Sequence, residues 1–428
     1  MSIAAMTDAP ANPARRRAAL AFVLVTVLLD VLSFGVVIPV FPRLFENFLG
    51  GDAAKAAALI GVLGTVWAAI QFFVSPVLGA LSDRYGRRPV ILLSNLGTGF
   101  DFLIMALAPN IAWLVIGRVL NAATAASFAA ANAYVADVTT PEARAKSYGF
   151  MGAAFGLGFI VGPAIGGFLG QIDLRLPFFL GAALGFANFL YGRFVLPESL
   201  TAEHRRPFAW RQANPVGALK FLAGDRVLLS LACAAFLIQL AHALYPNIWV
   251  LYTAWRYDWS PATVGVTLAT TGVLAMIVQG GLIQPIVKRF GERTTLLLGL
   301  VCWSSGFVWQ GLAATGRLFL MAMPLGALAG LAAPALNAIL SQRVSADRQG
   351  QLQGAQSGLQ SISGLIGPGL YTGTLALAMG PAHGAVPGGL PFFIAAGLLL
   401  LALALAWRGA RVQPPSDAPA ATPVSELR

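Results

Sequence analysis

The sequence predicts an all-α membrane protein, with twelve transmembrane helices arranged as two pseudo-symmetric six-helix bundles. Composition gives the first reason for this prediction. The 428-residue chain is 57% hydrophobic and only 11% charged. A soluble protein of this size needs more charge to cover its surface. The apolar residues also occur in long uninterrupted runs, which indicates that lipid is the solvent for much of the chain.

An internal repeat gives the second reason. Residues 84–88 (RYGRR) recur as 289–293 (RFGER), and Gly162-Pro163 recurs as Gly367-Pro368. Asn132 recurs as Asn337, and all three pairs share an offset of 205 residues. One offset kept across three elements indicates two copies of a single unit. Paired membrane repeats are typical of secondary transporters.

Twelve apolar runs are long enough, or nearly long enough, to span a bilayer as helices. Six of them fall in each copy of the repeat. In chain order they cover residues 18–38, 56–81, 90–107, 111–135, 147–169, 176–196, 227–252, 263–287, 295–314, 318–340, 351–379 and 390–407.

These runs divide the chain into two bundles joined by a polar linker. We expect five segments: an N-terminal tail (1–17), a first bundle (18–196), a linker (197–226), a second bundle (227–407) and a C-terminal tail (408–428). With both termini and the linker cytoplasmic, 22 of the 28 Lys and Arg residues are cytoplasmic and five are external. This bias follows the positive-inside rule. It predicts a multi-pass membrane protein with both termini on the cytoplasmic side of a plasma membrane.

The net charge of +11 is explained by this topology, so it does not predict a nucleic-acid surface. The two cysteines, Cys233 and Cys302, both fall in predicted helices. They indicate neither a disulfide framework nor a metal site. We expect no cofactor, and we expect the chain to function as a monomer in the lipid bilayer.

Three ionisable residues interrupt the apolar runs. Asp30, Asp101 and Arg118 all lie roughly 16–20 Å from the cytoplasmic edge at the rise of an α-helix, so they can share one polar site. Such residues are costly inside a membrane and mark functional sites by default. They predict a proton-coupling site in the first bundle. The alternative is a static ion pair that fixes helix packing.

A basic loop joins the second and third predicted helices. Gly79 is expected to let the second helix pack closely against a neighbour, and Gly86 to permit a tight turn. Arginines here can bind carboxylates at neighbouring helix ends, forming a cytoplasmic gate; a positive-inside anchor and an ordinary solvated charge pair are the alternatives. The candidate gate residues are Gly79, Asp83, Arg84, Gly86, Arg87, Arg88, Asp137 and Arg144.

Small residues four apart mark the fifth predicted helix and allow close helix contact. A proline within this helix removes a backbone hydrogen bond and bends it. The motif favours a moving element, although a packing seam without movement explains it as well. Its residues are Gly158, Gly162, Pro163, Gly166 and Gly167.

Other polar or amphipathic residues inside predicted helices could line a substrate path. Each of the polar ones is as readily explained by a hydrogen bond that packs two helices. The candidates are Gln71, Thr124, Asn132, Gln239, His242, Asn247, Trp249 and Asn337, with Tyr245 nearby.

The pattern G-x-x-S-D-R-x-G-R-R-P at 79–89 and the pattern G-x-x-x-G-P-x-x-G-G at 158–167 resemble signature motifs of the major facilitator superfamily. The second resembles the mark of its drug:proton antiporters. The likeness runs nearly end to end and is nearest to the tetracycline-resistance efflux branch. Further stretches that carry it include residues 39–42 (PVFP), 117–118, 133–137 (AYVAD), 196–199 (LPES) and 348–354 (RQGQLQG).

This resemblance implies the major facilitator fold and proton-coupled efflux of amphipathic drugs. It assigns Asp30, Asp101 and Arg118 to coupling. Asp83, Arg87, Asp137 and Arg144 match the cytoplasmic gate, and Gln71 and Thr124 match positions that face the substrate path. Two positions depart from the branch, which typically has an acidic residue where Trp303 stands and often a histidine where Ala275 stands. These departures bear on substrate handling and coupling, and they leave the transporter class and mechanism intact.

Alternative functions remain open at this point. A proton-coupled transporter of a metabolite or sugar-like solute would use the same fold. An enzyme would need a convergent constellation, yet His204, His242 and His383 fall in the linker, a helix and an external segment, so no enzymatic activity is expected. A non-transporting sensor would share the fold but show no flux.

Overall fold

The computed structural model describes residues 13–200, 203, 205, 225–345, 348–380 and 386–409. Residues 1–12 of the expected N-terminal tail, residues 201–202, 204 and 206–224 of the expected linker, and residues 410–428 of the expected C-terminal tail lie outside this part. So do His204 and His383.

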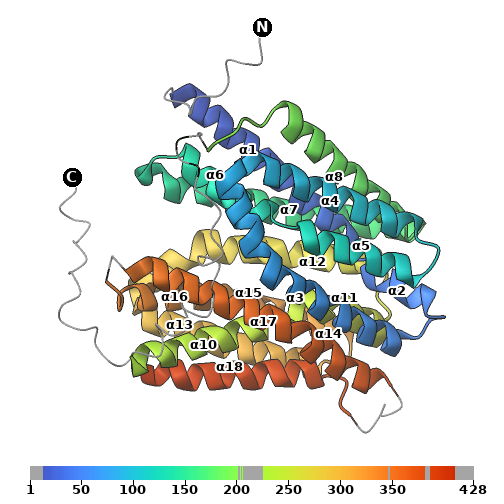
Figure 1. The fold of residues 1–428 in the computed structure, drawn as a ribbon. Helices are drawn as coiled ribbons and strands as arrows, with labels where there is room; N and C mark the ends of the chain where they lie inside the picture. The colour runs from blue at the N-terminus through green and yellow to red at the C-terminus, as the bar shows by residue number, and fades with distance from the viewer. Residues whose placement is uncertain are drawn as a thin grey trace. The chain divides into compact units, whose positions relative to one another are not determined.

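The described chain is helical almost throughout, as Figure 1 shows. The first-copy helices are α1 (Pro13–Val37), α2 (Phe41–Phe48), α3 (Ala53–Tyr85), α4 (Arg87–Leu107), α5 (Ile111–Thr124), α6 (Ser127–Val138), α7 (Pro141–Ile172) and α8 (Leu176–Phe194). The second-copy helices are α10 (Arg226–His242), α11 (Leu244–Tyr257), α12 (Pro261–Ile277), the π-turn η4 (Val278–Leu282), α13 (Ile283–Leu312), α14 (Gly316–Met321), α15 (Met323–Leu328), the 3₁₀ turn η5 (Ala329–Leu331), α16 (Ala332–Ser341), α17 (Gln349–Met379) and α18 (Leu390–Gly409).

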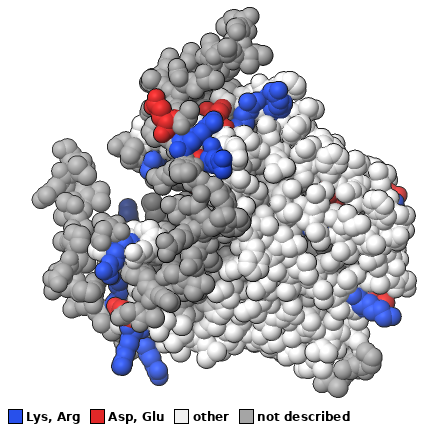
Figure 2. Space-filling view, viewed as in Figure 1, with Lys and Arg blue, Asp and Glu red and all other residues white. Residues whose placement is uncertain are grey.

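The twelve predicted spans all coincide with helix. Ten stretches of the described chain are long and apolar enough to cross a membrane. One of them, Pro261–Leu312, is 52 residues long and contains two predicted spans, while α8 carries the remaining one. Figure 2 shows a broad area of the visible face without Lys, Arg, Asp or Glu, as a lipid-facing surface requires. The predicted fold class is confirmed.

The repeat is visible in the backbone as well as in the sequence. Gly86, between α3 and α4, has φ 110°, and Gly291, 205 positions later inside α13, has φ 76°. These left-handed conformations favour glycine, because a side chain strains them. Gly291 lies between the predicted spans 263–287 and 295–314, and the repeated prolines Pro163 and Pro368 both lie inside long helices.

The chain forms two compact units. Unit 1 comprises Met1–Ala213, Asn247–Val273 and Pro368–Val386. In it α1 packs against α7 and α8, and α4 packs against α8 and α5. One buried apolar cluster surrounds Ile91 and Tyr134, and a second surrounds Phe102 and Phe178.

The later segments of unit 1 are joined to its first-copy helices by specific contacts. Arg43 donates to the carbonyl oxygen of Trp259 at 2.6 Å, and the Gln171 side chain lies 3.2 Å from the Ser260 hydroxyl. A Cβ placed on Gly64 would lie 2.9 Å from Pro368, so α3 and α17 approach closely here.

Unit 2 comprises Asn214–Pro246, Leu274–Gly367 and Pro387–Arg428. In it α18 packs along α10 and α13, and α13 packs against α16. Phe307, Phe319 and Phe392 form a buried aromatic centre, with Phe319 and Phe392 edge to face at 5.7 Å between ring centroids.

Candidate functional site

A buried ion pair joins α4 to α5 in unit 1. Arg118 is salt-bridged through Nη2 to Asp101 Oδ2, and its Nε donates to Asp101 Oδ1 at 3.2 Å. The Asp101 side chain is 0% exposed and that of Arg118 is 14% exposed. The guanidinium carbon also lies 5.3 Å from the Phe41 ring centroid and 5.5 Å from that of Phe102. Both charges are therefore neutralised inside an apolar surrounding, a geometry that membrane-embedded charges require.

Asp30, on α1, has a different partner. The Ser127 hydroxyl donates to Asp30 Oδ2 at 2.5 Å. Ser127 is the first residue of α6, so the carboxylate lies at a helix N-terminus, where the partial positive charge of the backbone favours an anion. Sequence reasoning missed Ser127, because the apolar run at 111–135 predicted one continuous helix.

That run is in fact two helices, since α5 ends at Thr124 and α6 begins at Ser127. Polar side chains satisfy the backbone groups exposed at the break. Gln71 donates to the carbonyls of Ala122 and Ala125, at 2.6 and 3.0 Å. Ser94 was not predicted as a site residue; it donates to the Thr124 carbonyl at 2.6 Å and accepts from the Ala126 amide at 2.9 Å. Interrupted membrane helices of this kind are typical of ion and substrate sites in transporters.

The structure does not join the three ionisable residues into one hydrogen-bonded cluster. Arg118 and Asp101 bind each other, while the carboxylate of Asp30 binds Ser127. Similar depth in the membrane fixes only the position along each helix axis, not the direction in which a side chain points. Of the three residues, the structure therefore brings Asp101 and Arg118 into direct contact and leaves Asp30 with a separate partner.

Arg87 is the centre of the cytoplasmic loop cluster. Its Nη1 is salt-bridged to Asp83, one helical turn earlier across the α3–α4 junction, and its Nε donates to Asp137 Oδ2 at 3.2 Å. Ser199 also donates to Asp137 Oδ2, at 2.9 Å. The structure therefore brings Asp83, Arg87 and Asp137 together, tying the α3–α4 junction to the end of α6.

Glu198 is a functional candidate that sequence reasoning missed, although the stretch 196–199 contributed to the family resemblance. Its carboxylate accepts the backbone amides of Arg87 and Arg88 at 2.9 and 3.2 Å, so it caps the N-terminus of α4. A carboxylate at this position satisfies two amides and the helix dipole together. The same oxygen that binds Arg87 accepts the amides of Ser199 and Leu200.

The other predicted gate residues have separate roles. Arg88 donates to the carbonyls of Gly192 and Arg193 near the end of α8. Arg144 donates to the Ala136 carbonyl at 3.3 Å, while Arg84 lies over the Tyr85 ring at 5.1 Å.

Gly79 departs from its prediction. A Cβ placed on Gly79 would meet none of the described residues within 4 Å. The close helix packing expected there is absent from the described part of the chain, because this position of α3 is exposed.

The fifth-helix motif is the tightest helix contact of unit 1. A Cβ on Gly158 would lie 2.9 Å from Val31, and one on Gly162 would lie 2.8 Å from the Gly35 Cα. Gly166 faces the Val36 backbone just as closely. These residues pack α7 directly onto α1, the helix that carries Asp30.

The opposite side of the same motif contacts α12. A Cβ on Gly167 would lie 3.1 Å from the Cα of Gly265, and one on Gly265 would meet the Pro163 carbonyl. Pro163, inside α7, thus belongs to the contact that joins α7 to α12.

The predicted substrate-path residues fall in several places. Thr124 and Asn132 make hydrogen bonds to backbone within their own chain segment. Asn247 lies beside Gly64, and Trp249 is buried on α11. The His242 ring lies 5.9 Å from that of Trp303 in an aromatic cluster. Gln239 and Asn337, by contrast, come together at a polar pocket in unit 2.

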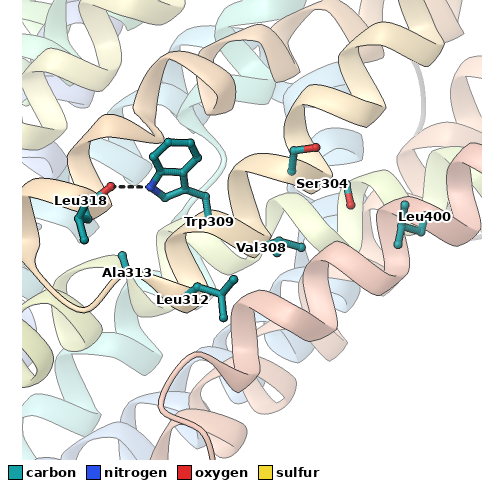
Figure 3. Close-up of a pocket in the computed structure, with 8 residues that line it drawn as sticks. Ser304, Val308, Trp309, Leu312, Ala313, Leu318 and Leu400 are labelled. Atoms are coloured by element: carbon teal, nitrogen blue, oxygen red, sulfur yellow. Dashed lines mark hydrogen bonds between the residues drawn. The ribbon is translucent and has the colours of Figure 1, made fainter.

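A larger pocket of unit 2 is apolar. It has a volume of about 550 Å³, and Figure 3 shows its one indole donor, Trp309 Nε1, bonded to the Leu318 carbonyl at 2.9 Å. The pocket offers few free hydrogen-bonding groups for a polar ligand. Its lining consists of Ser304, Ser305, Val308, Trp309, Leu312, Ala313, Leu318 and Leu400.

Comparison with known proteins settles the family. The chain matches the Major Facilitator Superfamily model over residues 23–368 and 231–427. The chain belongs to the major facilitator superfamily. This confirms the resemblance read from the sequence motifs.

Similarity to curated proteins narrows the branch within the superfamily. The chain is 39% identical to the "Tetracycline resistance protein, class C" of Escherichia coli, over 92% of this chain and 97% of that protein. It is 37% identical to the class G protein of Vibrio anguillarum, over 84% of this chain and 91% of that protein. The resemblance to the tetracycline-resistance branch is thereby confirmed.

Solved structures agree on the fold. The human organic anion transporter MFSD10 (TETRAN) superposes with a TM-score of 0.67 at 23% identity, covering 92% of this chain and all of that one. The nucleoside transporter NupG superposes with a TM-score of 0.73 at 13% identity, again over 92% of this chain and all of that one.

Proposed function

We propose that the protein is a proton-coupled antiporter that exports amphipathic drugs of the tetracycline type by alternating access. Within the structure, this proposal rests chiefly on the buried Arg118–Asp101 pair and on the interruption between α5 and α6, where Asp30 binds Ser127. Charged side chains without a countercharge are energetically costly inside a membrane. Their presence in a superfamily of transporters supports a coupling role, and the near end-to-end similarity to tetracycline-resistance proteins supports drug efflux.

In this proposal Asp30 is the group that binds and releases the proton. Asp101 already has a guanidinium as countercharge, whereas the carboxylate of Asp30 has only a hydroxyl and a helix N-terminus. A carboxylate without a countercharge in an apolar interior gains the most from neutralisation by a proton. The Arg118–Asp101 pair would then orient α4 and α5 at the break on which Asp30 depends.

The loop cluster around Arg87 would stabilise one conformation at the cytoplasmic side. It ties the α3–α4 junction to the end of α6 through Asp137, and Glu198 anchors the chain that follows α8 to the start of α4. A set of contacts made in one state only biases the equilibrium between states. The cluster would therefore set turnover and leave substrate recognition to other residues.

The protein is a multi-pass membrane protein. For its arrangement in the membrane we propose cytoplasmic termini, bundles at 18–196 and 227–407, and a cytoplasmic linker at 197–226, as the distribution of Lys and Arg indicates. We further propose that it resides in the inner membrane of a bacterial cell, acts as a monomer and catalyses no covalent chemistry.

Flux in everted membrane vesicles tests the proposal. When a proton gradient with an acidic vesicle interior is imposed, the vesicles should accumulate tetracycline against its concentration gradient. A protonophore should abolish this accumulation. A panel that adds sugars and small metabolites separates drug export from the second candidate, a proton-coupled transporter of a metabolite or sugar-like solute. Uptake of a metabolite in place of every drug would overturn the proposal.

A further inference from the structure

One pocket of unit 2 is lined mainly by carboxamide side chains. It has a volume of about 220 Å³ and lies between α10, α16 and α17. Five Gln or Asn side chains and one serine hydroxyl line it, together with apolar side chains and without any charged residue. The polar lining residues are Gln239, Asn337, Gln353, Gln356, Ser357 and Gln360.

The spacing along α17 explains why these groups share a face. Gln353, Gln356 and Gln360 are separated by three and four residues, a spacing that places side chains on one side of a helix. Leu352 and Ala355, on another side of α17, are buried at 2% and 0% exposure. The helix thus packs through its apolar side and presents its amides to the pocket.

Two of the amides are linked to each other. Gln356 Nε2 donates to Asn337 Oδ1 at 2.9 Å. This bond leaves the carbonyl oxygen of Gln356 and the amide hydrogens of Asn337 available, so an acceptor and donors lie side by side. Within the described chain, the side chains of Gln239, Gln353 and Gln360 make no hydrogen bond, which leaves further donors and acceptors around the same pocket.

The fold itself does not require three of these amides, whereas Asn337 has Asn132 as its counterpart in the first copy. At the 205-residue offset, the first copy has Phe34 where the second has Gln239, Met151 where it has Gln356, and Phe155 where it has Gln360. The same helical positions are therefore compatible with apolar side chains. Amides at these positions, on membrane-spanning helices, point to a ligand or a water-filled cavity.

We propose that this amide pocket binds the polar edge of the transported molecule through neutral hydrogen bonds. The inference rests on the proposed export function and names the substrate chemistry: an edge of adjacent hydroxyl, carbonyl or carboxamide groups. Carboxamides both donate and accept, so they match such an edge and offer no ion pair to a phosphate or a simple cation. At about 220 Å³, the pocket holds part of a drug-sized molecule, since whole ligands need roughly 300–1,000 Å³.

Trp303 and the amide pocket, both in unit 2, have in common that neither carries an acidic side chain. Trp303 is 4% exposed and packs among aromatic rings, with its centroid 5.9 Å from that of Phe307. No acidic residue lines the amide pocket. In this proposal, neutral side chains of unit 2 recognise the polar edge of the ligand. An ion pair with the ligand would instead require a carboxylate in the pocket.

Substitution of the amides by leucine tests the proposal, with tetracycline as the ligand because one edge of it carries contiguous hydroxyl and keto groups. Gln356→Leu and Gln360→Leu should each raise the KM for tetracycline flux in everted vesicles about five- to tenfold, as expected for one lost neutral hydrogen bond. Vmax should change little. Gln351→Leu is the matched control, because Gln351 is exposed on α17 and does not line the pocket.

A second ligand separates recognition from general damage. Export of tetraphenylphosphonium, a lipophilic cation without hydrogen-bonding groups, should keep its KM in both variants if the wild type exports it. Equilibrium binding of tetracycline to purified wild type and variants, followed by tetracycline fluorescence, should weaken by the same factor as KM rises.

The outcomes distinguish this inference from the proposed function. If wild type neither binds nor exports tetracycline or any other drug of the panel, both are overturned. If it exports other drugs but neither binds nor exports tetracycline, the export function stands and the pocket assignment is wrong. If wild type exports tetracycline while Gln356→Leu and Gln360→Leu match Gln351→Leu in KM and binding, the export function stands and the pocket assignment is wrong.

Discussion

Asp101 and Arg118 lie 17 positions apart in the sequence and meet inside the membrane-spanning part of unit 1, where the aspartate side chain is 0% exposed. The pair joins α4 to α5 just before the point at which α5 ends. Its neutralised charges explain how the chain tolerates two ionisable residues at this depth. A role in coupling and a role in folding can therefore be separated only by variants that treat the two charges together.

Removing one partner of this pair should damage folding more than removing both. Arg118→Leu leaves Asp101 buried without a countercharge, a change that costs about 3–5 kcal/mol in buried pairs. We expect a large loss of monodisperse protein in detergent, measured by size-exclusion chromatography. The double variant Asp101→Leu/Arg118→Leu should recover most of the yield.

Gradient-driven flux of tetracycline in vesicles containing the double variant then measures the contribution of the pair to coupling. We expect folded protein that accumulates no tetracycline. Full activity of the double variant would show that the pair serves packing alone.

Gly86→Ala should destabilise the α3–α4 junction. Gly86 has φ 110°, and a Cβ there would collide with the Glu198 carboxylate that caps α4. Backbone strain of this kind costs on the order of 1–3 kcal/mol, and loss of the cap adds to it. The thermal midpoint in detergent should fall by several degrees. Gly79→Ala, at an exposed position of α3 where a Cβ would meet none of the described residues within 4 Å, should leave the midpoint unchanged or slightly higher. Equal shifts in both variants would contradict the role of Gly86.

Much of this arrangement was predictable from the sequence, because long apolar runs and a fixed repeat offset report directly on membrane spans and topology. The positive φ of Gly86 and Gly291 follows from the same repeat. Helix interruptions were not predictable, since residues 111–135 are apolar on both sides of the break at Ala125 and Ala126. Composition identifies a hydrophobic run but does not reveal where its backbone hydrogen bonds are interrupted.

Contacts across the fold were predicted unevenly for a related reason. Asp83, Arg87 and Asp137 were assigned to one cluster because a motif marks them. The sequence alone does not mark Ser127 and Glu198 as site residues, because a serine in an apolar run and a glutamate at the start of a linker are common. Hydrogen-bonding partners of this kind depend on the direction of each side chain, which neither burial patterns nor depth in the membrane determines.

Asp83→Asn should lower turnover more than substrate affinity. The change removes the ion pair to Arg87 but leaves Arg87 bound to Asp137, so the cytoplasmic cluster is weakened without being lost. We expect a several-fold lower Vmax in everted vesicles, with tetracycline binding to purified protein nearly unchanged. Asp52→Asn removes a more exposed ion pair, with Lys55 at the start of α3, and should have no effect. Weakened binding with normal Vmax would place Asp83 in recognition and out of the gate.

Asp30→Asn should abolish gradient-driven export while the protein still folds and inserts. The amide is nearly isosteric, can still accept the Ser127 hydroxyl, and is cheaper than a carboxylate inside the membrane. Asparagine cannot bind and release a proton, which is the step that the proposed cycle assigns to residue 30. Folded yield and downhill exchange of tetracycline across vesicles without a gradient should remain, while uphill accumulation is lost. Ser127→Ala is the control that keeps the carboxylate, and it should shift the pH dependence of transport while preserving uphill export. Uphill export by Asp30→Asn with an unchanged pH profile would show that Asp30 is a packing residue. Asp101 would then be the candidate coupling group. In that case the separate Asp101→Asn variant should lose coupling.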